Sequence, residues 1–235
     1  MRFYCVNPNL LIIMKNYFVL VLIFAFNFVI SQEIKYLKKE DFPDGIYMTL
    51  NDVLNRKPSS NEKLYIKYHK SVKDTLTLPE KTFFHFKDGR NKVLYPLGVS
   101  YKGEMYFQTY RKFTNKQDKG YDPDAYNRFC KVTSYGRFLY FEEDIMGIWS
   151  KAWKVNLGLI GASINSKTRG MVIDFEKKEI NIFRDCPDVN IFLKEHNLPV
   201  FPCKTESLSV EDTRKIVEEI NKPLNLLDVK KESID

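Results

Sequence analysis

The stretch from Leu64 to Phe141 constrains the fold most, because its pattern is that of several short β-strands. Tyr, Phe, Val and Thr alternate there with polar residues, and turn residues separate the apolar runs. Two tight hairpins are predicted, in which residues 93–100 pair with 104–110 through Tyr101-Lys102-Gly103, and residues 128–133 pair with 137–141 through Ser134-Tyr135-Gly136. Aromatic side chains at strand alternation are expected to pack as a core, although this density could also build a carbohydrate- or peptide-binding face.

The flanking segments predict helices and one further hairpin. Residues 46–48 read as a short extended piece, and Thr49 with Asp52 forms an imperfect capping box for a helix that ends at Pro58. Near the other end, the pattern predicts a hairpin of residues 171–175 with 179–183 and helices over 189–196 and 210–221, the last one opened by Ser209 with Asp212.

These elements predict one α+β domain over residues 32–225, with a predominantly antiparallel β-sheet and peripheral helices. About 200 residues are enough to bury a substantial core. Residues 226–235 are expected to fray. Within the domain, residues 145–164 combine a helical apolar stripe with glycines, so we expect a short amphipathic helix in which Trp149 and Trp153 share a face and pack on the sheet.

The N-terminal residues 1–31 are predicted to be a signal peptide, with Met14 favoured as the true start. Lys15 supplies the positive region, residues 17–30 the apolar region, and cleavage is expected between Ser31 and Gln32. The alternative is that residues 10–30 stay uncleaved as a membrane anchor. Both readings place the chain outside the cytoplasm, in the periplasm, at the cell surface or in the extracellular medium.

Removal of residues 1–31 leaves Cys130, Cys186 and Cys203 in a compartment that permits disulfides. Cys186 and Cys203 bracket a segment that contains Pro187, Pro199 and Pro202, and we predict that they are bonded. The alternative is three reduced and mostly buried thiols.

Charge and motif spacing give little support to nucleic-acid, metal or catalytic chemistry. The formal net charge is +7, but the basic residues are scattered without a long run, so no nucleic-acid partner is predicted. His69, His85 and His196 lack the spacing of a zinc site, and His196 is expected to end a helix with an exposed imidazole. No cofactor and no metal is predicted.

Two acidic clusters and one cysteine were weighed as candidate sites. Asp118, Asp122, Asp124 and Asn127 resemble a calcium loop only loosely and are read as a solvated turn. The run Glu142-Glu143-Asp144 could serve glycosidic acid–base chemistry, but we expect it to cap a following helix. Cys130 would need a neighbouring histidine to act as a nucleophile, so no catalytic residue is assigned.

Four short motifs in order carry a resemblance to a known family: Gly45-Ile46-Tyr47-Met48-Thr49 with its helix, residues 98–107, residues 136–141 and Val172-Ile173-Asp174-Phe175. This order resembles that of an uncharacterised family of small exported bacterial proteins, a domain of unknown function. The resemblance implies fold and export, and it carries over no catalytic residue.

The sequence therefore predicts an exported binding or envelope-associated interaction protein, with an envelope protein or a glycan as partner and with membrane contact only if the N-terminal segment is uncleaved. The alternatives are an extracytoplasmic enzyme and an N-terminally membrane-anchored protein. A deep pocket with convergent titratable groups would favour the enzyme. A flat exposed aromatic patch would favour the binding protein.

Overall fold

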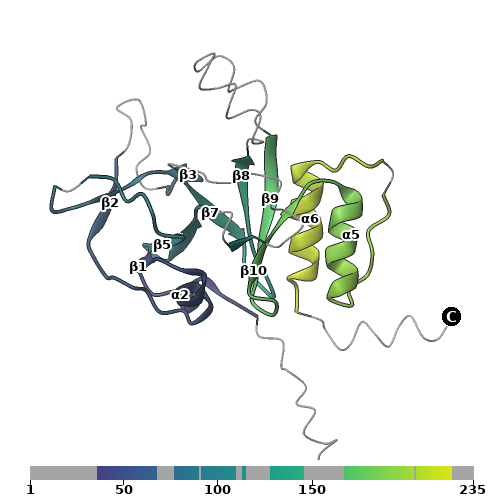
Figure 1. Ribbon diagram of the computed structural model, residues 1–235, viewed down its shortest axis with the longest axis horizontal. Helices are drawn as coiled ribbons and strands as arrows, with labels where there is room; N and C mark the ends of the chain where they lie inside the picture. The colour runs from purple at the N-terminus through teal and green to yellow at the C-terminus, as the bar shows by residue number, and fades with distance from the viewer. Residues whose placement is uncertain are drawn as a thin grey trace, which may run out of the picture. The chain divides into compact units, whose positions relative to one another are not determined.

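An antiparallel β-sheet is the central element of the computed structural model (Figure 1). The structure describes residues 36–67, 77–89, 91–109, 113–114, 128–145, 167–203 and 205–223. The strands of the main sheet lie in the order β1-β5-β6-β7-β8-β9-β10, with β3 also paired to β7, while β2 and β4 form a separate two-stranded sheet. The predicted class, a single α+β domain with a predominantly antiparallel sheet and peripheral helices, is confirmed.

The strands are β1 (Gly45–Tyr47), β2 (Leu64–Ile66), β3 (Lys81–Thr82), β4 (Phe84–Phe86), β5 (Gly98–Tyr101), β6 (Glu104–Phe107), β7 (Phe129–Ser134), β8 (Leu139–Ile145), β9 (Lys167–Asp174) and β10 (Glu179–Phe183). The helices are the 3-10 helix η1 (Lys39–Asp41) and the α-helices α2 (Leu50–Leu54), α5 (Cys186–Glu195) and α6 (Val210–Ile220).

The predicted hairpins all form, but their bounds differ from the prediction: β5 and β6 are shorter than residues 93–100 and 104–110, and residues 135–138 rather than 134–136 connect β7 and β8. Lys102 and Gly103 occupy the β5–β6 turn with φ values of 54° and 75°, the left-handed region that a two-residue hairpin turn of this type requires. The carboxylate of Asp44 accepts hydrogen bonds from the N–H groups of Lys102 (2.9 Å) and Gly103 (3.1 Å) and so fixes this turn. The strand predicted from residue 171 begins earlier, at Lys167.

The helix starts follow the capping signals. The Thr49 side chain accepts from the N–H of Asp52, and that of Ser209 accepts from the N–H of Asp212, as the sequence predicts. Helix α5 begins three residues before the predicted start, because Asp185 caps it and Pro187 is tolerated in its first turn.

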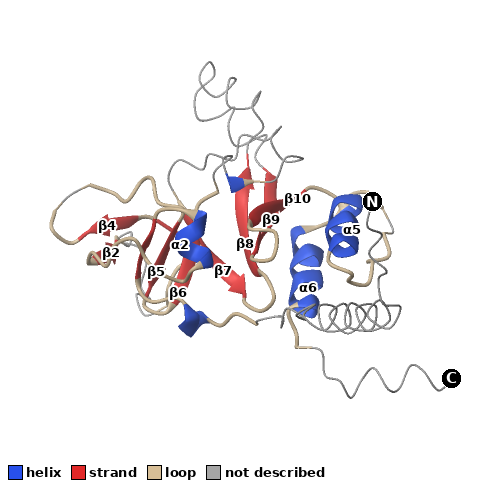
Figure 2. Ribbon diagram, turned by 60° about the horizontal axis from the view of Figure 1, so that its bottom comes forward, coloured by secondary structure: helices blue, strands red, loops and turns tan. Residues whose placement is uncertain are grey.

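The two faces of the main sheet contribute to three apolar cores. The inner core joins one face of the whole sheet to α2 and includes Tyr47, Met105, Phe107, Phe141, Met171 and Ile182. On the other face, the β2–β4 sheet covers β5–β7 through a core that includes Ile46, Leu64, Phe84, Val99, Tyr106 and Phe129. Helices α5 and α6 cover β8–β10 through a core that includes Phe138, Tyr140, Val172, Phe183, Phe192 and Val217 (Figure 2).

The prediction for Glu142, Glu143 and Asp144 is wrong, because strand β8 continues through all three residues to Ile145. Partners from distant segments hold this acidic run extended: Thr109 contacts Glu143, Arg214 contacts Glu142, and Lys81 contacts Asp144. A strand can carry three acids when each of them finds such a partner.

Several predictions fall on residues outside the described ranges. They concern the signal peptide over residues 1–31, His69, the loop of Asp118, Asp122, Asp124 and Asn127, the helix with Trp149 and Trp153, and the tail over 226–235. Among the described residues, no helix has both the length and the apolar character needed to cross a bilayer.

Candidate binding site

A cavity of about 540 Å³ lies at the β2–β4 end of the protein. Its walls come from β1, the residues just before β2, the end of β4 and the segment that leads into β5. The lining residues are Ile46, Met48, Ser60, Glu62, Phe86, Gly89, Asn91, Lys92, Val93, Leu94, Tyr95 and Pro96. This volume is within the usual range for small-ligand sites, about 300–1,000 Å³.

The cavity has an apolar floor and an apolar rim. Ile46 and Val93 are buried at 4% and 3% exposure and belong to the core beneath the cavity. Tyr95 and Met48 are 75% and 43% exposed, and both line the cavity, so they add exposed apolar surface beside it. The site therefore offers apolar surface at two depths.

Backbone hydrogen bonds fix the walls in place. The N–H of Ile46 donates to the carbonyl of Ser60 (2.7 Å), and the N–H of Val93 donates to that of Phe84 (2.9 Å). Beneath the rim, the buried side chain of Gln108 donates to the carbonyl of Leu94 (3.4 Å). Because strands carry these contacts, the cavity is formed before any ligand arrives.

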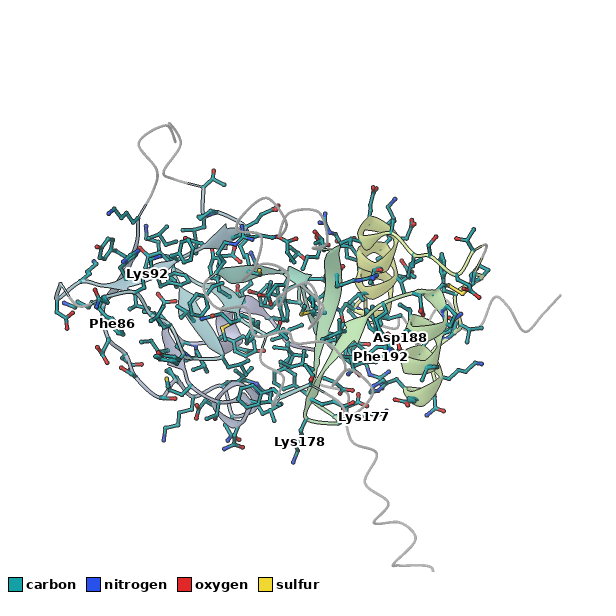
Figure 3. All side chains as sticks on the ribbon, turned by 45° about the horizontal axis from the view of Figure 1, so that its top comes forward. Phe86, Lys92, Lys177, Lys178, Asp188 and Phe192 are labelled. Atoms are coloured by element: carbon teal, nitrogen blue, oxygen red, sulfur yellow. A yellow bond between two sulfur atoms is a disulfide. The ribbon has the colours of Figure 1, made fainter. Side chains whose placement is uncertain are left out.

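Some polar side chains of the lining contact other parts of the protein. The Ser60 hydroxyl donates to the Glu62 carboxylate (3.1 Å). Lys92 and Phe86, both labelled in Figure 3, also line the cavity, and the Lys92 ammonium lies 4.1 Å from the centre of the Phe83 ring. The lining contains neither histidine nor cysteine. An apolar group fits this arrangement, whereas a proton-transfer pair is not present among the lining residues.

Glu143 is a buried carboxyl group in the inner core, 4% exposed and away from the cavity. Its oxygen accepts from the hydroxyl (2.6 Å) and the N–H (3.2 Å) of Thr109. Burial raises the pKa of Glu143 to about 8, against the lowering effect of Thr109, so the group is largely protonated at neutral pH.

Cys130 is a free, buried thiol that packs in the same core as Phe107 and Phe141. Burial, followed by the nearby Glu143, raises the pKa of Cys130 far above its ordinary value. A thiol held in its protonated form is a poor nucleophile, which argues against a catalytic role for Cys130.

His196 is buried at 5% exposure, so the expectation of an exposed imidazole is wrong. Its Nε2 lies 2.7 Å from Oδ2 of Asp174, and its Nδ1 lies 3.2 Å from Oε2 of Glu176. Arg137 forms a two-pronged ion pair with Glu176 (2.7 and 3.0 Å). These contacts bind the end of α5 to the β9–β10 turn.

The pKa of Asp174 reflects this network. Burial alone would raise it, but the contact with His196 and the N–H groups of Lys177 and Glu176 hold it below its ordinary value. Asp174 is fully buried, so it acts as a fixed anion inside the fold. Its role here is structural.

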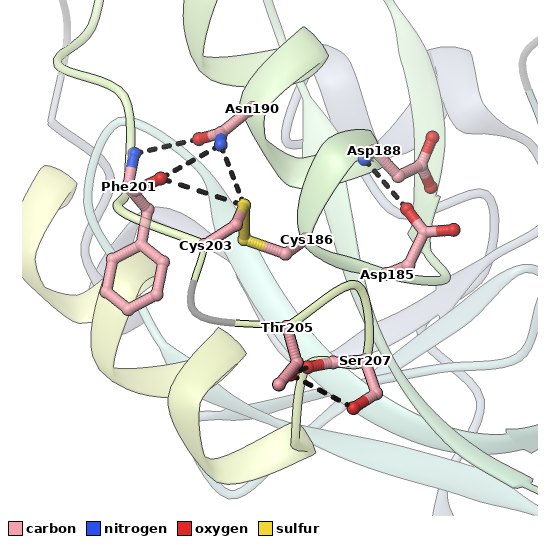
Figure 4. The surroundings of a disulfide bond; sticks show 8 residues. All are labelled: Asp185, Cys186, Asp188, Asn190, Phe201, Cys203, Thr205 and Ser207. Carbon is pink, nitrogen blue, oxygen red and sulfur yellow. Dashed lines mark hydrogen bonds between the residues drawn. A yellow bond between two sulfur atoms is a disulfide. The ribbon is translucent and has the colours of Figure 1, made fainter.

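The predicted disulfide is present between Cys186 and Cys203 (Figure 4). Asn190, one turn into α5, accepts from the N–H of Phe201 (2.8 Å) and donates to its carbonyl (2.9 Å). The bond and these two contacts hold the segment after α5 against the helix. The sequence predicts this pairing, and the disulfide lies at the opposite end of the sheet from the cavity (Figure 1).

Sequence reasoning brought none of the cavity residues together as a site. His85 lies in β4, with its ring stacked on Tyr65 at 5.3 Å between ring centres. No group of three or more His, Cys, Asp or Glu side chains in the described part of the chain could hold a metal ion. Tyr95, 75% exposed, is the lining residue that stands out, but its exposure is known only from the structure, so the sequence carries no signal for the cavity.

The fold and the cavity define an antiparallel α+β protein with a preformed, apolar surface site. The chain belongs to a family of unknown function, DUF6563, whose model matches residues 45–187. This range contains every residue that lines the cavity, and it confirms the resemblance to an uncharacterised domain. Neither the search of curated proteins nor that of solved structures found a significant match.

Proposed function

We propose that this protein is an exported binding protein that holds an apolar group of its ligand in the cavity. The observation that carries this proposal is the position of Tyr95 and Met48, both exposed, at the rim of a cavity whose floor is the buried pair Ile46 and Val93. Large exposed apolar side chains beside an apolar hollow are typical of recognition sites.

Binding is favoured over catalysis by the polar groups of the lining. The Ser60 hydroxyl donates to the Glu62 carboxylate, and the lining contains no histidine or cysteine, so it supplies no nucleophile with a neighbouring base. The buried titratable groups, Glu143, Cys130 and Asp174, belong to cores or to a structural network and do not line the cavity.

Export is supported by the apolar run over residues 17–30 and by the Cys186–Cys203 disulfide, because disulfides persist mainly in oxidising compartments. An envelope protein or a glycan with an apolar group remains the proposed partner. The alternative of an extracytoplasmic enzyme has no supporting contact among the described residues.

The test is the binding of an uncharged apolar probe, N-phenyl-1-naphthylamine, followed by its fluorescence. Tyr95→Ala should weaken binding about 3- to 10-fold, the loss of one aromatic contact, while the free energy of unfolding changes by less than about 0.5 kcal/mol. Ile191→Ala is the matched control, because Ile191 is 51% exposed on α5, outside the cavity.

Equal binding by wild type and Tyr95→Ala would contradict the proposal, and so would a loss with Ile191→Ala of the same size. If the two variants differ as expected, capture from envelope extract by wild type but not by Tyr95→Ala identifies the natural ligand.

A further inference from the structure

The solvent-facing side of the β2–β4 sheet carries only cationic and aromatic side chains. Leu64, Ile66 and Phe84 are buried, so the alternate residues of both strands point away from the core. An isolated bridge places Lys92 opposite His85 and so adds it to the same side. We name this surface the basic face, and it comprises Lys63, Tyr65, Lys67, Phe83, His85, Lys87 and Lys92.

Two lysines on the basic face lie at directly opposite positions of the ladder, where their positive charges repel each other. The N–H of Lys87 donates to the carbonyl of Lys63 (2.9 Å), which extends the β2–β4 ladder and sets these two lysines opposite each other. Like charges at directly opposite positions destabilise a sheet. The fold alone gives no reason for this pairing, whereas a bound anion would offset its cost.

The other two lysines gather around Phe83. The ammonium of Lys92 lies 4.1 Å from the centre of the Phe83 ring, and the ladder places Lys67 opposite the same residue. Burial lowers the pKa of His85, and the charges of Lys92 and Lys67 lower it further, as expected where the local potential is positive.

These cations are not neutralised within the protein. Lys63, Lys67, Lys87 and Lys92 are all exposed, and the described part of the chain supplies no carboxylate that forms an ion pair with them. The basic face contains no Asp or Glu. Its four ammonium groups are therefore available to an anionic partner.

We infer that the basic face binds an acidic glycan, a linear polysaccharide that carries carboxylate or sulfate groups. A flat pair of extended strands with cations at both ends of the ladder matches a linear polymer with repeated negative groups. The Tyr65 ring, 39% exposed, lies between these cations and offers a surface for a sugar ring.

Two other anionic partners fit the basic face less well. Single-stranded nucleic acid is held by stacking successive bases on several free aromatic faces, but His85 occupies one face of the Tyr65 ring and Lys92 covers the Phe83 ring, so the basic face offers one free ring face rather than a row of them. A membrane surface requires apolar side chains that insert beside the charges, and Tyr65 is the one large, exposed apolar side chain on this face.

The test uses heparin and polygalacturonate as probes, with neutral dextran, anionic phospholipid vesicles and single-stranded DNA for comparison, all at the same low ionic strength. Changing Lys63, Lys67, Lys87 and Lys92 together to Gln should raise the dissociation constant for both acidic glycans about tenfold or more. The same four positions changed to Arg should retain binding, because the positive charges are kept.

The matched control changes Lys178, Lys194, Lys215 and Lys222 to Gln, which removes the same charge from exposed positions on the β9–β10 turn, α5 and α6. This control should change the dissociation constant less than about twofold. Thermal unfolding by circular dichroism verifies that each variant is folded.

Three results would overturn the inference: no binding of either acidic glycan by wild type, equal losses in the basic-face variant and the control, or stronger binding of vesicles or DNA than of the glycans. Changing Lys63, Lys67 and Lys87 alone to Gln, none of which lines the cavity, should weaken glycan binding and leave the binding of N-phenyl-1-naphthylamine unchanged, so this inference and the proposed cavity function can fail separately.

Discussion

The outer face of one sheet is covered in two different ways, and the difference indicates which end is built for stability and which for recognition. Helices α5 and α6 cover β8–β10 with a disulfide, the Arg137–Glu176–His196–Asp174 network and a two-pronged Arg214–Glu142 ion pair (2.8 and 2.8 Å). The β2–β4 sheet covers β5–β7 as a thin layer that leaves a cavity on one side and a basic face on the other. The reinforced end is held by a disulfide and by buried ion pairs between its elements, whereas the thin end has a cavity and four exposed lysines that form no ion pair with a described carboxylate.

The largest effect on the free energy of unfolding is expected in the core between the β2–β4 sheet and β5–β7, and it tests whether this core is tightly packed. Phe84 is fully buried and meets the rings of Tyr101, Tyr106 and Phe129 edge-on, 5.1 to 5.5 Å between ring centres. Phe84→Ala should lower the free energy of unfolding by about 3–5 kcal/mol. Phe86→Ala, two residues along the same strand but at the open cavity, should cost about 1 kcal/mol. Equal costs in urea unfolding would mean that the cavity wall is as tightly packed as the core.

The next largest effect on the free energy of unfolding is expected from removal of the disulfide at the helical end. Cys186 and Cys203 are 17 residues apart, and a loop of this size corresponds to about 3 kcal/mol in the chain-entropy model. The double change of both cysteines to Ser should therefore lower stability by about that amount, while binding of the cavity probe is unchanged once the protein is folded. Impaired probe binding in the folded variant would show that the two ends are coupled.

A smaller effect, dependent on pH, is expected from Asp174. Its folded pKa lies below the unfolded value, so its stabilisation is present above about pH 4 and is lost as the pH falls through the folded pKa. Asp174→Asn should cost about 2 kcal/mol at pH 7, and the gap to wild type should close in strong acid. Glu195→Gln, which removes the exposed partner of Lys177, is the control and should change little. A gap of constant size at all pH values would assign the loss to packing rather than charge.

The sequence predicts those parts of the fold that are set by near neighbours. The caps at Thr49 and Ser209 each depend on a residue three positions away, and both are found. The turn at Lys102-Gly103 is found where its glycine predicts it, although Asp44 adds hydrogen bonds to it from far along the chain. Glu143 and His196 were misjudged because their surroundings come from far along the chain, Thr109 for the first and Asp174 for the second. The disulfide was predictable because its two cysteines are close in sequence and the remaining described thiol is buried in a core.

The cavity and the basic face could not be predicted from the sequence either, because their residues also come from segments that are far apart along the chain. The cavity lining forms only after β1 has joined the main sheet and β4 has paired with β2, which brings together Ile46, Phe86 and Val93. The lysines of the basic face look scattered in the sequence, because two strands and a bridge separate Lys63 from Lys92. Because these lysines lie together in the structure, they favour an anionic partner, whereas the scattered basic residues of the sequence do not indicate one.

The order of the two covering layers along the chain has a consequence for biogenesis. The layer that covers β5–β7 consists of β2 and β4, which precede those strands in the chain. The layer that covers β8–β10 consists of α5 and α6, which follow them. The outer face of β8–β10 therefore stays exposed until α5 and α6 pack on it. This face includes the aromatic residues Phe138, Tyr140 and Phe183. A chain cleaved near residue 187 would keep Cys186 without Cys203 and would expose this apolar sheet face, so we expect it to aggregate more readily than the uncleaved chain.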